Sequence, residues 1–366
     1  MIKKNLVIGV ISFVWLWSCK KVQDDNPYTT TPYAVPDISN FRTFPIDAAN
    51  PLTEEGVALG HQLFFDPILS LDNTLSCAGC HRPEQGYSDP RRVSIGVGGT
   101  SGRRQAMPII NMAWHKRFFW DGKDSTLQNQ AKRPVSDTLE MHLPWDVAVA
   151  RLNNSAKYKV LFLKAFGVNT IKQEDVIKAL EQYEKALIVY NSPFDKYQRG
   201  EAALSESAQR GMQIFNTEKG DCFHCHTTQP AETLISPAKI FANNGLDEYE
   251  DGEDFPDIGL GAISGIIGDY GKFKIPSLRN LAMTAPYMHD GRFATLDEVI
   301  DNYDLGPKQS PSLEPIMLAD ANKRVLLYGR YGLGLTAQDK ADLKTFLLSF
   351  TDSTVLSNPL FRAPMP

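Results

Sequence analysis

The chain has 366 residues, and its 38 basic and 43 acidic side chains give a formal net charge of −5. This length is enough for two domains of ordinary size. Because the charge balance is acidic and shows no basic block, we expect no nucleic-acid partner.

The first 19 residues have the pattern of a bacterial lipoprotein signal. Lys3 and Lys4 precede an apolar run from Leu6 to Trp17, which is short for a membrane span of about 20 residues. Cleavage before Cys19 would leave a lipidated cysteine that tethers the mature chain to a membrane, most simply the outer membrane of a Gram-negative bacterium. Since Trp17 is unusual so near such a cysteine, a plain secretory signal and an uncleaved anchor stay open. All three alternatives predict export to the periplasmic side.

Residues 20–45 are rich in Thr, Pro, Asp and Asn, a composition that predicts a flexible tether. A helix is expected next, with Thr53 as its N-cap and two acids in its first turn. Its apolar positions are Val57, Leu59, Leu63 and Phe64.

Two short motifs carry the chemistry of this sequence. Cys77, Cys80 and His81 form a Cys-x-x-Cys-His run, and the same pattern recurs in the group Cys222, Cys225 and His226. In such a run the two thiols attach covalently to a c-type haem and the adjacent imidazole binds its iron. The sequence therefore predicts two haems, with a zinc site or a pair of redox dithiols as alternatives.

Three further helices are expected around these motifs. Thr170 and Gln173 form a capping-box pattern before an apolar periodicity that continues to Tyr190 and closes the first half. Ser205 is expected to cap the helix before the second motif, whose apolar positions are Met212, Ile214 and Phe215. Thr336 is expected to cap a last helix that packs against the second haem domain.

Strand-like alternation is scarce, so the predicted fold is mainly α, with two cytochrome c-like haem domains packed against each other. The predicted boundaries are 46–200 for the N-terminal domain and 201–366 for the C-terminal domain.

The segment 247–257 holds seven acids: Asp247, Glu248, Glu250, Asp251, Glu253, Asp254 and Asp257. A solvated loop is one interpretation. A docking patch for a basic electron-donor protein is the other.

Taken together, the motifs resemble those of the bacterial di-haem cytochrome c peroxidases, a family that includes MauG. The resemblance covers nearly all of the chain after the tether. It rests on LGHQLFFDP at 59–67, FWDG at 119–122, Gln130, LEM at 139–141, PFDKY at 193–197, FKIPSLRN at 273–280 and APYMHDG at 285–291.

The resemblance implies a peroxidatic haem on His81 and an electron-relay haem on His226. Peroxidases of this family that need reductive activation carry a distal His in a Ser-Ile-Gly-His run, where this chain has Val97. Valine cannot bind iron, so the first haem is expected to be open to peroxide in the resting enzyme. Ligation by His115 or His142 instead stays an alternative.

On the second haem, the resemblance places Tyr303 where the usual peroxidase supplies a Met ligand. Thr295 and Glu298 form a capping box for the helix that carries Tyr303. MauG resembles this chain both in its open first haem and in its tyrosine on the second. A phenolate ligand should lower the potential of the second haem relative to Met. The alternative is that Tyr303 only packs in the core, and that the ligand is one of Met283, Met288 and Met317.

The resemblance also assigns three residues around the first haem. Glu140 is expected over its open face as the acid–base group of peroxide cleavage, and Gln130 is expected to orient the peroxide or a water. Trp120 is expected between the haems as an electron relay, although a buried Trp is often only part of a core.

A calcium ion between the domains is a further expectation from the family. It would take backbone carbonyls at Thr284 and Pro286 and a side-chain amide at Gln105, where the family usually has Asn.

Three hypotheses for the function follow. The first is a peroxidase that reduces hydrogen peroxide with electrons from a small cytochrome c or a cupredoxin. The second is a MauG-like enzyme whose peroxide-derived, high-valent haems oxidise residues of a partner protein. The third, a plain electron-transfer cytochrome, leaves the open haem and Glu140 unexplained.

Overall fold

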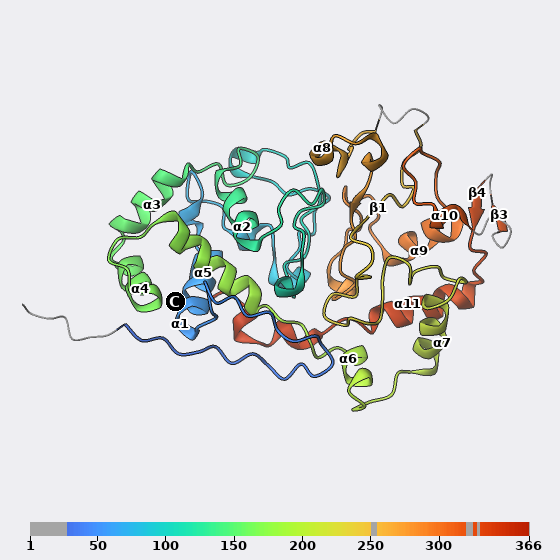
Figure 1. Cartoon of the computed structure of the whole chain (residues 1–366), viewed down its shortest axis with the longest axis horizontal. Helices are drawn as coiled ribbons and strands as arrows, with labels where there is room; N and C mark the ends of the chain where they lie inside the picture. Colours follow the sequence, from blue (N-terminus) through green and yellow to red (C-terminus); the bar gives the residue numbers. More distant parts are fainter. Residues whose placement is uncertain (1–27, 250–254, 320–324, 328–329, 366) are drawn as a thin grey trace, which may run out of the picture.

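The computed structural model describes residues 28–249, 255–319, 325–327 and 330–365. The signal segment with Cys19 and four acids of the segment 247–257 (Glu250, Asp251, Glu253 and Asp254) lie outside these ranges. Two largely helical halves lie side by side (Figure 1), which confirms the predicted fold class. Within the described ranges, no helix combines the length and the apolar composition that a membrane crossing requires.

The elements of each half follow the order of the sequence. The N-terminal half contains α1 (Glu54–Phe65), α2 (Leu127–Ser136), α3 (Trp145–Asn154), α4 (Ala156–Phe166) and α5 (Gln173–Ala186). The short helix α6 (Pro193–Gln198) leads to α7 (Glu206–Phe215), α8 (Gly261–Ser264), α9 (Leu296–Leu305), α10 (Ile316–Ala319) and α11 (Ala337–Leu348). Two small antiparallel pairs are formed by β1 (Phe241–Ala242) with β2 (Phe273–Lys274) and by β3 (Val325–Leu327) with β4 (Arg330–Gly332).

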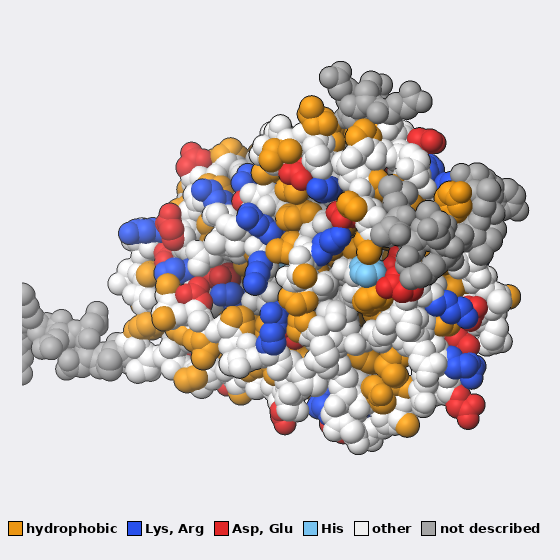
Figure 2. Space-filling view, turned by 45° about the vertical axis from the view of Figure 1, so that its right-hand side comes forward, with side chains coloured by type: hydrophobic (Ala, Val, Ile, Leu, Met, Phe, Trp, Pro, Cys, Tyr) orange, Lys and Arg blue, Asp and Glu red, His pale blue; other side chains and the backbone are white. Residues whose placement is uncertain are grey.

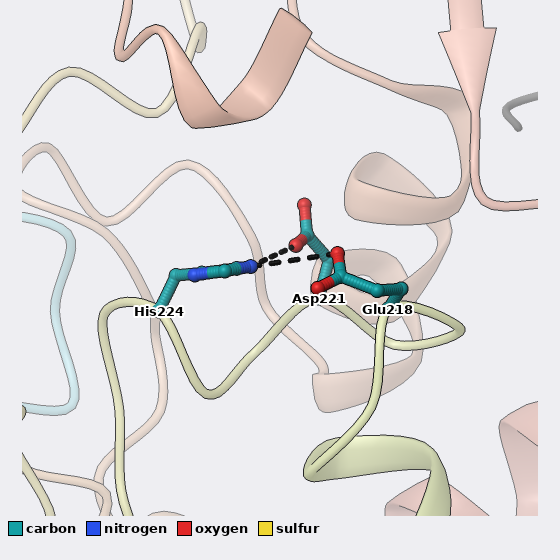
Figure 3. Close-up of side chains that lie close together, drawn as sticks. All are labelled: Glu218, Asp221 and His224. Carbon is teal, nitrogen blue, oxygen red and sulfur yellow. Dashed lines mark hydrogen bonds and ion pairs between the residues drawn. The ribbon is translucent and has the colours of Figure 1, made fainter. Parts of the chain in front are cut away.

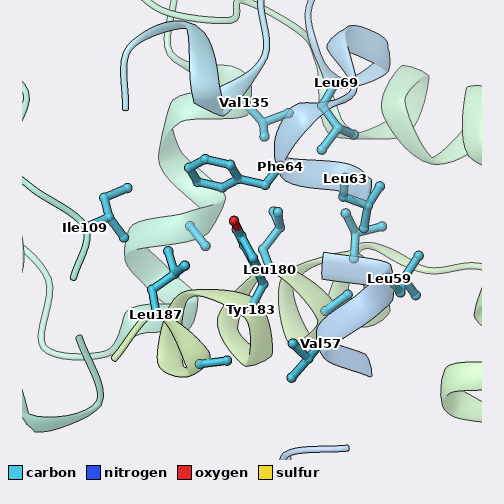
Figure 4. Close-up of a cluster of buried hydrophobic side chains, with 14 of the residues drawn as sticks. Val57, Leu59, Leu63, Phe64, Leu69, Ile109, Val135, Leu180, Tyr183 and Leu187 are labelled. Carbon is cyan, nitrogen blue, oxygen red and sulfur yellow. The ribbon is translucent and has the colours of Figure 1, made fainter. Parts of the chain in front are cut away.

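Each half is built on one closely packed helix pair. Helix α1 packs on α5 and helix α7 packs on α11. A Cβ added at Gly60 would lie 2.0 Å from the Ala179 carbonyl oxygen, and one added at Gly211 would lie 2.0 Å from the Asp342 carbonyl oxygen. Only glycine allows the backbones to approach so closely. Figure 4 shows the apolar side chains around the first pair, with Tyr183 of α5 reaching toward Phe64 of α1.

Most predicted caps are confirmed. The hydroxyls of Thr53, Ser205, Thr295 and Thr336 each accept a hydrogen bond from a backbone amide in the first turn of the helix that follows. In these four cases a residue type with a strong N-cap preference directly precedes the apolar pattern.

The predicted limits of α5 were wrong at both ends. Its N-cap is Lys172 rather than Thr170, and the Asp175 carboxylate accepts the Lys172 backbone N–H at 2.9 Å. The helix ends at Ala186, short of Tyr190, because the backbone of 187–189 turns to hydrogen-bond with Asn111. The apolar periodicity continues past Ala186, but tertiary bonds decide where the helix ends.

The two halves also share a repeated framework outside the helix pairs. Asn111 and Asn280 both adopt a left-handed conformation before a short 3₁₀ turn. At the same spacing along the chain, Thr126 and Thr295 cap the ten-residue helices α2 and α9. Each position of α2 therefore has an equivalent position in α9.

Segments at both ends cross between the halves. Near the C-terminus, Val355 and Phe361 are buried in the core of the N-terminal half, and Figure 1 shows the C-terminus beside that half. At the other end, Tyr28 donates to the Ala165 carbonyl oxygen at 2.7 Å, and Arg42 forms an ion pair with Glu232 of the C-terminal half. From Tyr28 onward the predicted tether therefore packs on the folded body, because its aromatic and charged side chains find partners there. The predicted boundary at residue 200 stays a prediction.

One buried ion pair joins α6 to the loop before α9. Arg279 makes two hydrogen bonds to the Asp195 carboxylate, at 2.7 and 2.9 Å, and the two side chains are 1% and 0% exposed. Arg279 also donates to the Ala231 carbonyl oxygen, and Asp195 accepts from Ser192. With its remaining hydrogen-bonding groups satisfied, such a pair holds its neighbours in one arrangement.

We predict that Gly211→Ala lowers the free energy of unfolding by about 1–3 kcal/mol, because the added methyl group overpacks the contact of α7 with α11. Denaturant titration of the purified holoprotein measures this loss. Gly268→Ala is the matched control, since the nearest atom to a Cβ at Gly268 is 3.9 Å away. Equal stability of the two variants would contradict the proposed role of Gly211.

Candidate haem sites

In both motif histidines, Nδ1 faces a backbone carbonyl oxygen. His81 Nδ1 donates to the Tyr87 carbonyl oxygen at 3.0 Å, and His226 Nδ1 lies 3.4 Å from the Leu234 carbonyl oxygen. A hydrogen bond at Nδ1 fixes the tautomer and leaves Nε2 available for a metal. Among the described residues, no cluster of metal ligands includes any of the four motif cysteines, and none of the four forms a disulfide. This arrangement fits haem and gives no support to the zinc alternative.

The N-terminal pocket has a volume of about 490 Å³ and is lined by Cys80 and His81 together with Glu140, Gln130 and Pro134. Burial raises the pKa of Glu140 to about 7, with a further upward contribution from Asp137. The Oε1 atom of Gln130 is buried and has no hydrogen-bond partner among the described residues. The pocket thus contains a carboxyl group that changes protonation near neutral pH and an amide oxygen available to a ligand.

Val97 and the two histidines considered as distal ligands lie in different places. Val97 is buried, and its N–H donates to the Glu140 carbonyl oxygen at 2.8 Å. His142 is exposed and does not line the pocket. His115 does line it, its Nε2 has no partner within the described ranges, and burial together with Lys274 holds its pKa well below the usual value. A neutral His115 therefore stays an alternative ligand for the first iron.

The lining of the N-terminal pocket is rich in basic side chains. Arg103 and Arg117 are exposed, whereas Arg104 is held by Asp121 and Asp257. Lys and Arg side chains also gather across the middle of the molecular face in Figure 2. This charge favours anionic groups, including the propionates of a bound haem.

The C-terminal pocket, of about 200 Å³, is more apolar and is lined by His226 and Tyr303. The Tyr303 hydroxyl oxygen accepts a hydrogen bond from Asn244 Nδ2 at 2.9 Å. Burial raises the pKa of Tyr303 to about 12, while the Asn244 bond acts in the opposite direction. Met288 and Met317 line the same pocket, whereas Met283 packs against the N-terminal core.

Trp120 and Lys274 line both pockets. The Trp120 indole N–H donates to the Gln105 carbonyl oxygen at 2.8 Å, and the Lys274 backbone N–H donates to the Trp120 carbonyl oxygen at 2.7 Å. Burial lowers the pKa of the Lys274 amine to about 8. The indole thus has one fixed position between the two candidate haem sites.

Two residues of the expected calcium site are buried. Gln105 and Thr284 have exposed fractions of 4% and 7%. The Gln105 side-chain nitrogen donates to the Asp89 carbonyl oxygen at 3.2 Å, so the amide oxygen is directed elsewhere.

Sequence reasoning missed three pocket residues. Lys274 lies in the FKIPSLRN motif at 273–280, but it was assigned no role from the sequence. Asn244 belongs to none of the motifs. Pro134 could have been found from the internal repeat, because it occupies in α2 the position that Tyr303 occupies in α9.

Comparisons with known proteins give the family. The model of the di-haem cytochrome c peroxidase family matches residues 54–203. The methylamine utilization protein MauG of Methylorubrum extorquens is 36% identical over 77% of this chain and 79% of its own length. The cytochrome c peroxidase Ccp of Escherichia coli is 37% identical over 72% of this chain and 56% of its own length.

Solved structures agree with this assignment. A MauG-like protein associated with microbial copper homeostasis has a TM-score of 0.76 and 33% identity, and the match covers 96% of this chain and 99% of that one. The di-haem peroxidase BthA of Burkholderia thailandensis shares the fold at 22% identity, with a TM-score of 0.69 over 88% of this chain and 90% of its own.

The chain belongs to the di-haem cytochrome c peroxidase family. It is therefore an oxidoreductase that uses peroxide as its acceptor and carries two c-type haems.

We predict that Glu140→Gln slows the reaction with peroxide by about 10²-fold or more, because an amide cannot accept the peroxide proton. In the unsubstituted protein the rate should rise as the pH passes upward through about 7, since the carboxyl must lose its proton before it can act as a base. Stopped-flow rates between pH 5 and 9 measure both effects.

Glu84→Gln, a change at an exposed acid of the same half, is the control and should leave the rate unchanged. An unchanged rate and pH profile in Glu140→Gln would remove Glu140 as the acid–base group.

Proposed function

We propose that this protein is a di-haem peroxidase that reduces hydrogen peroxide to water with electrons from an external protein donor, and that its N-terminal site accepts peroxide without prior reduction. One observation supports the proposal that the N-terminal site accepts peroxide without prior reduction. The repeated framework puts Pro134 in the N-terminal half where the C-terminal half has Tyr303. Proline offers no side-chain ligand, so the same backbone supports a filled site in one half and an open site in the other.

The haem held by Cys77, Cys80 and His81 would supply the iron at which the O–O bond is broken. Glu140 takes the proton from the near oxygen of peroxide and returns one to the leaving oxygen. Gln130 orients the peroxide through its free amide oxygen.

Trp120 is proposed as the relay between the sites. Its indole lines both pockets, and its hydrogen bonds hold it at one position between them. An aromatic ring placed in this way shortens each step of electron transfer between the two haems.

Tyr303 is proposed as the second ligand of the haem held by Cys222, Cys225 and His226. The amide of Asn244 supports this role, because an N–H donated to the phenolic oxygen stabilises its negative charge. Met288 and Met317, which line the same pocket, stay as alternatives.

Oxidation of residues of a partner protein is the second candidate function. The combination of an open first site with Tyr303 favours it, because an oxygen ligand stabilises oxidised iron and so favours sharing of oxidising equivalents between the haems.

The third candidate, a plain electron carrier, has no need of Glu140 in an open pocket.

The donor is proposed to be a small cytochrome or a cupredoxin. Of the acids in the segment 247–257 that the structure describes, Asp247 pairs with Arg292 and Asp257 pairs with Arg104. These two carboxylates are therefore engaged within the protein, so a docking patch would depend mainly on the other acids of the segment.

Calcium and the membrane anchor are further proposals. The amide oxygen of Gln105, with the carbonyls of Thr284 and Pro286, offers the oxygen ligands that calcium prefers. The anchor at Cys19, on the periplasmic side of the outer membrane, rests on the sequence pattern of residues 1–19.

We predict that Tyr303→Phe changes the absorption spectrum of the second haem, because the ligand oxygen is lost, and that Tyr303→Met raises its midpoint potential. Optical redox titration of the purified diferric protein measures both. Tyr287→Phe is the matched control, since Tyr287 lines the same pocket while its hydroxyl donates to the Leu281 carbonyl oxygen. A spectrum unaffected by Tyr303→Phe would exclude Tyr303 as a ligand.

A further inference from the structure

Three side chains with metal-binding atoms converge on the loop that follows α7 and runs into the second haem motif. His224 Nε2 lies 3.1 Å from Asp221 Oδ1 and 3.5 Å from Glu218 Oε2. Figure 3 shows the imidazole edge directed at both carboxylates. Within the described ranges, this is the only group of three or more His, Cys, Asp or Glu side chains close enough to share an ion.

The two separations measured from His224 Nε2 fit a shared cation. Ligand atoms that bind one zinc-sized ion at about 2.0–2.2 Å lie roughly 3–3.5 Å apart. The two contacts of His224 Nε2 fall at that separation, and the three ligand atoms all lie within 4.8 Å of one another. One imidazole N–H points its proton at a single acceptor, whereas a cation in the same place is bound by all three side chains.

The cluster is partly enclosed and its loop is held in place. The side chains of Asp221, His224 and Glu218 are 7%, 23% and 49% exposed. The Asp221 N–H donates to the Thr217 carbonyl oxygen at 2.9 Å, which ties the loop to the end of α7. One imidazole and one carboxylate are thus partly shielded, and the exposed glutamate leaves a side open for water.

His224 is also independent of haem attachment. It is one of the two residues between Cys222 and Cys225, and the attachment motif accepts any side chain there. The covalent link to the haem therefore gives no reason for an imidazole at this position.

We propose that Glu218, Asp221 and His224 form a binding site for a late first-row divalent cation, Zn²⁺ or Cu²⁺. One nitrogen and two carboxylate oxygens, with water in the remaining position, suit these ions. An imidazole ligand disfavours Ca²⁺ and Mg²⁺, which prefer oxygen ligands throughout. Because the loop carries both thioether cysteines, a bound cation adds positive charge beside the second haem and favours its reduced form.

The test is equilibrium dialysis of the full, untagged holoprotein against ZnCl₂ and, separately, CuCl₂, with metal counted per haem iron by mass spectrometry. The unsubstituted protein should bind about one Zn²⁺ or Cu²⁺ per chain at this site, and His224→Gln and Glu218→Gln should each weaken that binding by about 10-fold or more. His142→Asn is the matched control, because it removes an exposed imidazole outside the cluster and should bind as the unsubstituted protein does.

A second readout comes from the haem. Zn²⁺ should raise the midpoint potential of the second haem in the unsubstituted protein and in His142→Asn, and should have no effect in His224→Gln. Haem content measured beforehand should be two per chain in each variant. Equal metal binding by the unsubstituted protein, His224→Gln and Glu218→Gln would overturn the proposal.

Discussion

The arrangement of the two haem sites depends on the hydrogen bonds around Trp120. The Trp120 indole donates to the Gln105 carbonyl oxygen, the Gln105 N–H donates to the His289 carbonyl oxygen, and the Lys274 N–H donates to the Trp120 carbonyl oxygen, at 2.8, 2.8 and 2.7 Å. These bonds join the halves at the point where both pockets meet. Because backbone groups make most of these contacts, the position of the indole is set by the fold.

Around this junction, one backbone framework is used twice with different side chains. The turn after Asn111 leads through Trp120 to α2, and the turn after Asn280 leads through His289 to α9. The side chains that differ then determine the chemistry. Pro134 offers no side-chain ligand at its position in α2, whereas its equivalent in α9, Tyr303, has a hydroxyl oxygen that accepts a hydrogen bond from Asn244.

The local parts of this structure could be predicted from the sequence, because they depend on neighbouring residues. The haem motifs and the caps at Thr53 and Ser205 are examples, and both caps are confirmed. The limits of α5 could not be predicted, because bonds to Asn111 and Asn153 from distant segments decide them. The same reason applies to the burial of Phe361 in the N-terminal core.

Within the site, the resemblance supplied candidates that the geometry brings together at one pocket, among them Glu140 and Gln130. Lys274 and Asn244 were missed because their roles arise only from what they face in space. Lys274 is a buried amine between two pockets, and Asn244 is bound to a distant tyrosine. Such roles leave no periodic pattern in the sequence.

The central claim is that the N-terminal site is open in the resting protein, and the most direct test is stopped-flow spectroscopy of the diferric protein mixed with hydrogen peroxide, without any reductant. We expect a rapid change in haem absorption at the first mixing. No change until one haem has been reduced would contradict it, and would point to a distal ligand such as His115.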